Sequence, residues 1–257
     1  MNLKSIIPDK SIDLFVKNIW IFEHDENKHT SLPFFADGYP GLIFHQSEQG
    51  LTVNPQNKKM PTLFLYGQTI NPITLEISGA YKIIIFQFYP FVLKILFNIL
   101  PRSINDNCCD MTEIIENNFL NIDKILVNSS SLKEQVQAIS NMIMWFAERK
   151  TKNIDTSVAS AVKDITQSKG QLNIQLVVQK TGLNTRTFER RFLNETGLTA
   201  KQFAKIIQFQ SSMTQLSSKD YSKLTDIVYQ NGFADQSHFI RVFKVFTGKT
   251  PKYFKNK

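Results

Sequence analysis

The sequence predicts an α+β protein of two domains: a β-rich N-terminal domain with flanking helices, and an all-α C-terminal domain with two helix-turn-helix units joined by a long helix. At 257 residues the chain exceeds the usual size of one domain, and its 42% hydrophobic content is sufficient for packed cores. Short β-rich runs occupy the chain from Phe15 to Tyr89, and helical patterns follow them. One segment of the C-terminal half also occurs twice in similar form, which indicates a duplicated unit.

The β-rich runs are FVKNIWIF, GLIFHQ, TLFLYG and YKIIIFQF, and each is bounded by Gly, Pro, Asn or Asp. Runs of this length between turn residues are typical of an antiparallel sheet or barrel. After Pro90 the pattern changes to FVLKILFNIL, which predicts a short helix.

A stronger helix is predicted in SSLKEQVQAISNMIMWFAERK, where Ser131 and Glu134 have the spacing of a capping box. Its apolar residues recur every three or four positions, at Leu132, Val136, Ile139, Ile143 and Phe146. This stripe is too short for a coiled coil, so we expect it to pack against the β-rich domain. A homodimer formed through this helix is the alternative.

The polar segment 148–157, ERKTKNIDTS, is the expected domain boundary, which we place between residues 1–150 and 151–257. Charge changes at the same place: residues 1–154 hold 14 Lys and Arg against 15 Asp and Glu, whereas residues 155–257 hold 16 against 7. A domain this basic attracts a polyanion such as nucleic acid. A solvated basic face that only aids solubility is the alternative.

The duplicated segment reads TGLTAKQF at 196–203 and TGKTPKYF at 247–254. Aligning the copies by an upstream glycine extends the repeat, with one inserted residue between them. The matched positions are Gly182, Phe188, Phe192, Gly197, Thr199 and Phe203 in the first copy and Gly232, Phe239, Phe243, Gly248, Thr250 and Phe254 in the second.

Each copy predicts a helix, a tight turn at the glycine, and a second helix, which is a helix-turn-helix. Asn184 can cap the second helix of the first copy, and Asp235 or Ser237 that of the second. Phenylalanines four residues apart anchor one face of each second helix in the core, so the opposite face points outward. The outward residues are Arg186, Glu189 and Arg190 in the first copy and Gln236, Ser237, His238 and Arg241 in the second.

These outward side chains can hydrogen-bond base edges, because Arg pairs with guanine, Gln with adenine and Glu with the cytosine amino group. An exposed helix face is ordinarily polar, so no one of them alone indicates DNA. Their coincidence with a duplicated helix-turn-helix in the basic half predicts a DNA-reading surface.

Thr199 and Thr250 are predicted to cap the helices that follow the second helices, and Lys201 and Lys252 lie close behind. Free N–H groups at such a helix start can hold a backbone phosphate, although caps required only for folding are the alternative. The helix from Thr199 to about Leu216 would span about 27 Å. It would hold two recognition helices near the ~34 Å separation of successive major grooves, so one chain would read a non-palindromic site.

The strings GFADQSHFIRVFKVFTGKTP (232–251) and GLNTRTFERRFLNETG (182–197) resemble the AraC/XylS family of bacterial transcriptional regulators. The resemblance covers about residues 155 to 254. It implies a seven-helix DNA-binding domain with the outward residues at base-facing positions. The chain departs from the family at Val178 and Val228, where Ala is common, at Thr181, and at Gln208, where a linker-helix Arg is frequent. Loss of that Arg is expected to weaken an interdomain or phosphate contact.

The N-terminal half is similar, less specifically, to the cupin-type effector domains that accompany this unit, through ADGYPGLIF and FLYG. This similarity implies a cupin-like barrel with a small-molecule pocket. His24, His29 and His45 are too scattered for a metal cluster, so neither a metal nor another cofactor is expected. Cys108 and Cys109 are adjacent, which suits neither a disulfide nor a metal site, and we interpret them as ordinary residues.

The sequence therefore predicts a cytoplasmic transcription regulator, either an activator or a repressor, that binds double-stranded DNA and RNA polymerase, with control by a small-molecule effector and with no membrane association. The N-terminus MNLKSIIPDK has no apolar signal core. No catalytic constellation stands out, so an enzyme is not expected. One alternative is a DNA-binding regulator whose N-terminal domain only dimerises or contacts RNA polymerase, with no ligand. The other is an enzyme or binding domain with an inactive DNA module.

Overall fold

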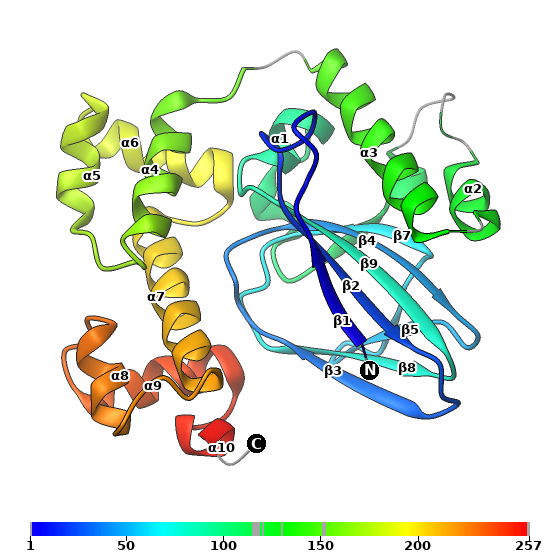
Figure 1. The fold of residues 1–257 in the computed structure, drawn as a ribbon. Coiled ribbons are helices and arrows are strands. Elements are labelled where there is room, and N and C mark those ends of the chain that lie inside the picture. The colour runs from blue at the N-terminus through cyan, green and yellow to red at the C-terminus, as the bar shows by residue number, and fades with distance from the viewer. Residues whose placement is uncertain (1, 115–118, 120, 130, 151–152, 256–257) are drawn as a thin grey trace. The chain divides into compact units, whose positions relative to one another are not determined.

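The structure is a computed structural model that describes residues 2–114, 119, 121–129, 131–150 and 153–255 (Figure 1). The chain divides into two compact units. The first comprises Met1–Phe34, Tyr39–Gln68 and Ile73–Ile154, and the second comprises Phe35–Gly38, Thr69–Pro72 and Asp155–Lys257. The first is built on antiparallel strands and the second is helical, which confirms the predicted α+β class. The boundary predicted at 150/151 adjoins residues 151–152, which lie outside the described residues.

The N-terminal unit contains two antiparallel sheets. The six-stranded sheet has the order β1-β2-β9-β4-β7-β10 and the four-stranded sheet the order β3-β8-β5-β6. The strands are β1 Asn2–Ile6, β2 Val16–His24, β3 His29–Phe34, β4 Gly41–Ser47, β5 Leu51–Asn54, β6 Lys58–Lys59, β7 Leu63–Tyr66, β8 Ile73–Ser78, β9 Tyr81–Phe88 and β10 Cys108–Asp110. The runs that stand out in the sequence form β2, β9, β4 and β7, which are adjacent in the larger sheet.

Alternate residues of these strands form a core between the two sheets. Ile83 and Ile85 of β9 belong to the same buried cluster as Leu75 and Ile77 of β8. The intervening residues of β9 are buried as well, because both faces of this central strand are covered. A strand buried on both faces reads as a continuous apolar run, which is why YKIIIFQF is so prominent in the sequence.

Helices pack on the other side of the larger sheet. They are α1 Val92–Phe97, α2 Ile122–Asn128 and α3 Leu132–Arg149, and the 3-10 helices η1 Pro101–Ile104 and η2 Met111–Glu113 lie between α1 and α2. Ser131 accepts a hydrogen bond from the Glu134 N–H at 3.2 Å, as expected for the start of α3. Phe146 of α3 lies 4.9 Å, ring centroid to ring centroid, from Phe97 of α1, which in turn lies 6.0 Å from Phe88 of β9. The predicted packing of the α3 stripe against the β-rich domain is therefore confirmed.

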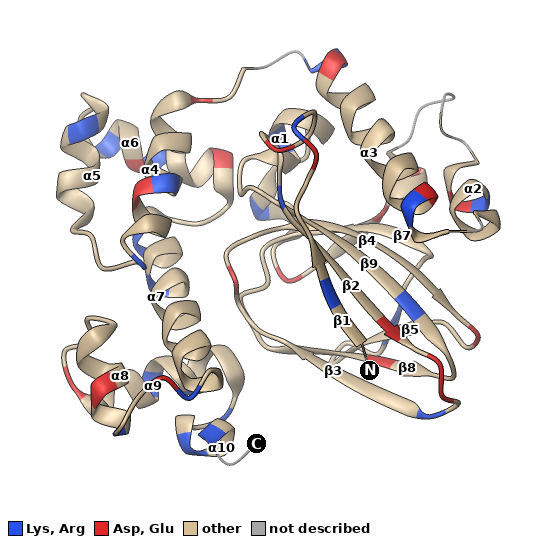
Figure 2. Ribbon diagram, in the orientation of Figure 1, with Lys and Arg blue, Asp and Glu red and all other residues tan. Residues whose placement is uncertain are grey.

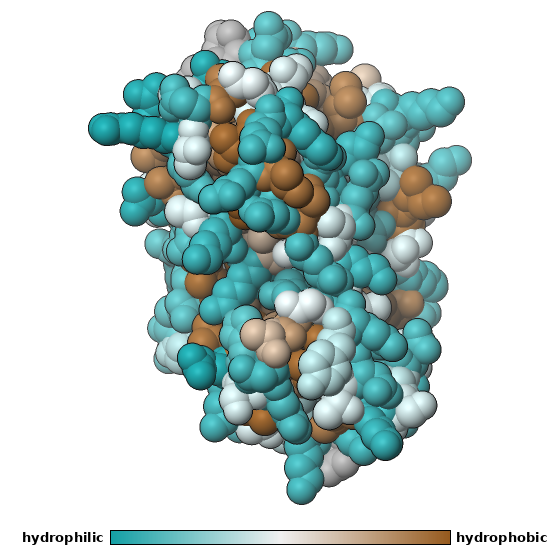
Figure 3. Space-filling view, turned by 90° about the vertical axis from the view of Figure 1, so that its left-hand side faces the viewer, coloured by the Kyte–Doolittle hydropathy of each residue, from teal (hydrophilic) through white to brown (hydrophobic). Residues whose placement is uncertain are grey.

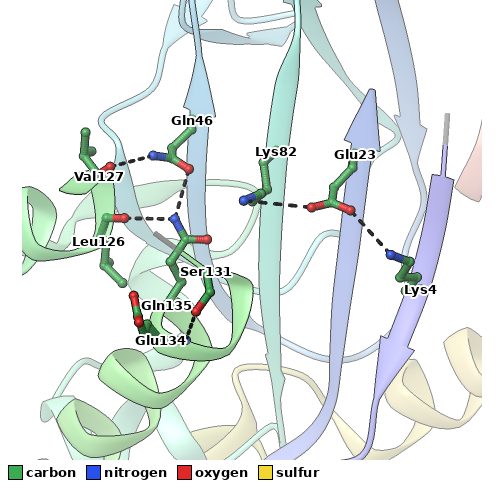
Figure 4. A network of polar contacts seen from close by, with 9 residues as sticks. All are labelled: Lys4, Glu23, Gln46, Lys82, Leu126, Val127, Ser131, Glu134 and Gln135. Carbon is green, nitrogen blue, oxygen red and sulfur yellow. Dashed lines mark hydrogen bonds and ion pairs between the residues drawn. The ribbon is translucent and has the colours of Figure 1, made fainter. Parts of the chain in front are cut away.

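A polar contact fixes α3 against the sheet (Figure 4). The Gln135 amide donates to Gln46 Oε1 on β4 at 3.0 Å and to the Leu126 carbonyl on α2 at 2.9 Å. Gln46 in turn donates to the Val127 carbonyl at 3.1 Å. Across the neighbouring strands, Glu23 lies between Lys82 and Lys4 in ion pairs of 3.9 and 3.7 Å.

This unit contains three histidines, His24, His29 and His45, and two adjacent cysteines. His45 is buried, its Nε2 lies 3.0 Å from the Pro61 carbonyl oxygen, and burial lowers its pKa. Cys108 and Cys109 are both free, and burial raises the pKa of the Cys109 thiol to about 11. Among the described residues no three His, Cys, Asp or Glu side chains gather as a metal site, and no helix there is long and apolar enough to cross a membrane.

The second unit is organised around one long helix, α7 (Figure 1). Its helices are α4 Thr156–Gln167, α5 Ile174–Thr181, α6 Thr185–Thr196, α7 Ala200–Ser217, α8 Leu224–Gln230, α9 Gln236–Thr247 and α10 Pro251–Lys255. Helices α4, α5 and α6 lie toward one end of α7, and α8, α9 and α10 toward the other. The predicted pair of helix-turn-helix units joined by a long helix is confirmed.

Candidate nucleic-acid interface

The first helix-turn-helix consists of α5, a turn at Gly182 and α6. Gly182 adopts φ +68°, a left-handed conformation that a glycine supplies without steric cost and that ends α5. The Asn184 side chain then accepts a hydrogen bond from the Thr187 N–H at 2.9 Å and starts α6, as the sequence predicts.

Two phenylalanines fix the orientation of α6. Phe188 and Phe192 are both 0% exposed, and their ring centroids lie 5.7 Å apart. Phe192 also lies 5.9 Å from Phe203 of α7, so the inner face of α6 is held against the long helix. On the opposite face Arg186 and Arg190 are exposed, while Glu189 is half-buried.

The second helix-turn-helix repeats this construction with α8 and α9. The turn contains Asn231 and Gly232, and Gly232 has φ +71°. Of the two residues that could cap α9, the cap is Asp235, whose carboxylate accepts a hydrogen bond from the His238 N–H at 2.7 Å. Phe239 and Phe243 are 1% and 0% exposed, and their centroids lie 4.7 Å apart.

The predicted outward residues of α9 fall into two groups. Gln236, Ser237 and Arg241 are exposed. His238 is half-buried, and its ring meets the Phe233 ring edge to face at 5.6 Å. Its Nδ1 is buried and has no hydrogen-bond partner among the described residues. Packing on Phe233 therefore leaves His238 less of its surface for an external partner than its neighbours have.

The threonine at the start of α7 forms a complete capping box. Thr199 Oγ1 accepts a hydrogen bond from the Gln202 N–H at 3.1 Å, and Gln202 Oε1 accepts one from the Thr199 N–H at 2.9 Å. In the second copy Thr250 precedes Pro251, the first residue of α10. Lys201 and Lys252 are exposed on the first turns of α7 and α10.

Sequence reasoning missed the first threonine of each duplicated segment. Thr196 is buried, donates to the Phe192 carbonyl at 2.8 Å and accepts from the Leu198 N–H at 3.3 Å. Thr247 makes the matching bonds to the Phe243 carbonyl at 2.7 Å and from the Lys249 N–H at 3.0 Å. Each threonine thus connects the end of a second helix to the next turn. The sequence does contain a signal for the role of these threonines, because the Thr-Gly pair is identical in both copies of the segment.

The positions where the chain departs from the resemblance are accommodated locally. Val178 and Val228 are buried, with 6% and 1% exposure. The Thr181 hydroxyl donates to the Val178 carbonyl at 2.6 Å and accepts from the Leu183 N–H at 3.3 Å, so it stabilises the end of α5.

Lysine and arginine residues are distributed over the helices of the C-terminal unit (Figure 2). Lys and Arg appear on α5, α6, α7, α9 and α10, and Figure 3 shows a mainly hydrophilic surface with scattered apolar side chains on the side viewed there. Arg191 and Lys180 are paired, with Asp155 at 3.5 Å and Asp164 at 2.9 Å. Within the described part of the chain, no carboxylate forms an ion pair with Arg186, Arg190 or Arg241, so their charges are available to an anionic partner.

Comparison with known proteins covers the chain in two parts. Residues 177–257 match the family model described as "Helix-turn-helix domain", and residues 4–110 match one described as "Domain of unknown function (DUF6597)". The chain is similar to the HTH-type transcriptional activator RhaS of Yersinia pestis (strain Pestoides F), with 32% identity over 76 residues, which is 30% of this chain and 28% of RhaS. RhaS of Escherichia coli (strain SE11) is 30% identical over 74 residues, 29% of this chain and 26% of that protein. The match therefore spans less than a third of these relatives.

The solved structures that match this chain are distant from it in sequence. ToxT from Vibrio cholerae O395 is 14% identical, with a TM-score of 0.48 over 94% of this chain and 97% of ToxT. The AraC-like transcriptional activator CuxR is 13% identical, with a TM-score of 0.23 over 81% of this chain and 86% of CuxR.

Proposed function

We propose that the chain is a transcription regulator of the AraC/XylS type that reads two adjacent major-groove segments of duplex DNA, because residues 177–257 match a helix-turn-helix family model and the chain is similar to RhaS. One observation carries the proposal. Helices α6 and α9 are each held by a pair of buried phenylalanines, and each turns exposed arginine outward in the basic half of the chain.

The side chains proposed to contact base edges lie on these two helices. An arginine can form two parallel hydrogen bonds to guanine, and Arg190 and Arg241 are exposed and form no ion pair within the described residues. His238 is the weakest candidate, because its ring packs on Phe233. The proposed base-contacting set is Arg186, Glu189 and Arg190 of α6 with Gln236, Ser237, His238 and Arg241 of α9.

Phosphate contacts are proposed at the starts of α7 and α10, through Lys201 and Lys252 and the N–H groups that follow Thr199 and Thr250. The Thr199 N–H is already bonded to Gln202, so later N–H groups of that turn would serve. Such contacts position the protein on DNA without reading its sequence.

The N-terminal unit is proposed to bind a small-molecule effector. An open cleft of about 420 Å³ lies at one end of β2, β4 and β9, with Glu23, His24, Gln46, Tyr81 and Lys82 among its lining residues. The alternative is that this unit only dimerises or contacts RNA polymerase. A metabolite panel separates the two, because a ligand at a hundredfold excess over its Kd stabilises the folded chain by about 2.7 kcal/mol. If no metabolite raises the Tm, the effector proposal fails.

The central proposal is tested by recovering genomic fragments with the purified full chain and sequencing them. We expect a recurrent site, bound more tightly than random fragments, with an affinity that falls linearly in log-log coordinates as salt rises. Recovery of fragments with no common site would contradict sequence-specific binding. The domains proposed, 1–150 and 151–257, are tested by expressing residues 151–257 alone, which should bind the same site.

A further inference from the structure

The two helix-turn-helix units are joined by more than the long helix α7. Gln171, in the loop between α4 and α5, donates from Nε2 to the carbonyl of Gln230 at 3.0 Å, across 59 residues of sequence. Gln208 on α7 donates from Nε2 to the carbonyl of Asn231 at 2.8 Å. Both carbonyls belong to the end of α8, where a helix leaves its last C=O groups without internal partners. The first helix-turn-helix unit and the long helix α7 therefore complete the hydrogen bonding of the second helix-turn-helix unit.

More amide side chains extend this contact. Asn231 is 2% exposed, and its Nδ2 donates to Gln215 Oε1 at 2.7 Å and to the Ile227 carbonyl at 2.9 Å. Gln215 donates to the Asp220 carbonyl at 2.9 Å and to the Gln230 side chain. We name this set the amide junction: Gln171, Gln208, Gln215, Gln230 and Asn231.

Two glycines bring the backbones together at the amide junction. A Cβ at Gly170 would lie 2.2 Å from the Ala204 carbonyl oxygen and 2.7 Å from the Gln208 nitrogen, both on α7. A Cβ at Gly232 would lie 3.0 Å from Gln171 Oε1. The loop after α4 therefore lies directly against α7 and against the turn of the second helix-turn-helix unit.

The side chains of the amide junction suit a rigid connection between two helix-turn-helix units that bind a polyanion. All five side chains are neutral, so salt that screens ion pairs leaves these bonds in place. The amides carry no net charge, so DNA phosphates attract them less strongly than they attract Lys and Arg. A partly buried amide whose bonds are made also resists rearrangement, because an unmade bond leaves a desolvated polar group.

We propose that the amide junction sets the separation and the angle between α6 and α9, so that Gln171, Gln208 and Asn231 are positioning residues for the spacing of the two DNA elements. This inference rests on the proposed function. One extra base pair moves an element by about 3.4 Å and rotates it by about a tenth of a turn around the duplex. A rigid junction keeps α6 and α9 in a fixed arrangement and does not adapt to the displaced element. Two helix-turn-helix units joined by α7 alone would bend to reach both elements.

The experiment uses the full chain and the site recovered from genomic fragments. Synthetic duplexes carry the two elements unchanged, with one or two base pairs inserted or removed between them, and the Kd is measured for each. We expect the wild type to lose at least about tenfold in affinity for a change of one base pair, the size of effect that a mismatched base pair produces. Gln171→Ala and Gln208→Ala should flatten this dependence to about threefold or less, while base preferences within each element stay unchanged.

Controls separate positioning from general damage. Gln167→Ala removes an exposed glutamine at the end of α4 that lies outside the amide junction, so it should keep the wild-type profile. Gln208→Arg restores a donor to the Asn231 carbonyl and should recover the dependence on spacing. Gln171 is exposed, so its alanine variant should fold even if Gln208→Ala does not.

The outcomes distinguish this inference from the function on which it rests. If the wild type binds no sequence better than random DNA, the proposed function fails. If the wild type is selective and both alanine variants keep its full dependence on spacing, the amide junction does not set the spacing and this inference alone is overturned.

Discussion

Arg191 of α6 lies 3.5 Å from the carboxylate of Asp155, the residue that caps α4. The same carboxylate accepts hydrogen bonds from the N–H groups of Ser157 at 3.0 Å and Val158 at 3.3 Å. One acidic side chain therefore starts the first helix of the C-terminal unit and ties it to the helix that carries Arg190. The outward face of α6 depends on this attachment as well as on its buried phenylalanines.

We predict that Asp155→Ala lowers the free energy of unfolding of the C-terminal unit by about 1–2 kcal/mol at pH 7, the usual contribution of an N-cap. Burial would raise the pKa of Asp155, but hydrogen bonds from Ser157 and Val158 and the charge of Arg191 together lower it below 3.8. The carboxylate thus stabilises the fold fully above its unfolded pKa, and this contribution is lost as pH falls through the lower folded pKa. The variant and the wild type should therefore converge as the pH falls below the folded pKa of Asp155.

The measurement is hydrogen exchange of peptides from α4 and α6 in the full chain, at pH 7 and under acid. Both tryptophans, Trp20 and Trp145, belong to the N-terminal unit, so their fluorescence serves as a control that this unit is unchanged. Asp155→Asn keeps a capping oxygen and should lose less than Asp155→Ala. Equal destabilisation by the alanine variant at both pH values would show that the charge of Asp155 plays no part.

A glycine pair gives a matched test of packing between α4 and α7. Gly170 and Gly182 both have positive φ, +75° and +68°. Gly182→Ala meets nothing within 4 Å, so we expect only the backbone strain of about 1–2 kcal/mol. Gly170→Ala suffers the same strain and also drives its Cβ toward the Ala204 carbonyl, which should cost about 1–3 kcal/mol more. Urea unfolding followed by hydrogen exchange in α4 to α7 measures the difference, and equal losses would exclude the close approach.

The local parts of this fold could be predicted from the sequence. Asn184 and the phenylalanine pairs act within one or two helical turns, so their spacing alone indicates a cap and a buried face. Strands β3, β5, β6 and β8 were not among the four runs singled out. Neither were β1, which is largely exposed, and β10, which has only three residues, so neither of these two shows an apolar run.

Contacts between distant segments could not be predicted in the same way. Gln208 departs from the arginine expected there, and a contact was expected to weaken, but its amide bonds Asn231 across 23 residues of sequence. The position of a glutamine in the sequence does not indicate which distant carbonyl its amide will hydrogen-bond. The half-burial of His238 likewise follows from where Phe233 packs. The DNA-contacting roles of the outward residues stay predictions.

The cysteine pair provides a test in the N-terminal unit. With a pKa of about 11 instead of 9.0, the Cys109 thiol holds roughly a hundredfold less thiolate at pH 8 than an unfolded chain does. We predict that iodoacetamide alkylates Cys109 about a hundredfold more slowly in the native protein than in urea. Mass spectrometry of the peptide containing Cys109 measures the rate. Alkylation at similar rates in both conditions would mean that the half-buried thiol is not protected as its raised pKa implies.

The arginines of the two second helices allow base reading to be separated from charge. Arg190→Ala and Arg241→Ala should each weaken binding to the recovered site by about 1–3 kcal/mol and relax the preference at one position. Arg190→Lys and Arg241→Lys keep the charge but lose the planar pair of donors, so at a base contact they should recover little of that loss. At a phosphate contact lysine would restore most of it. Competition binding against a library of single-base variants distinguishes these results, and uniform loss across all sequences would assign the arginine to the backbone and remove it from the reading face.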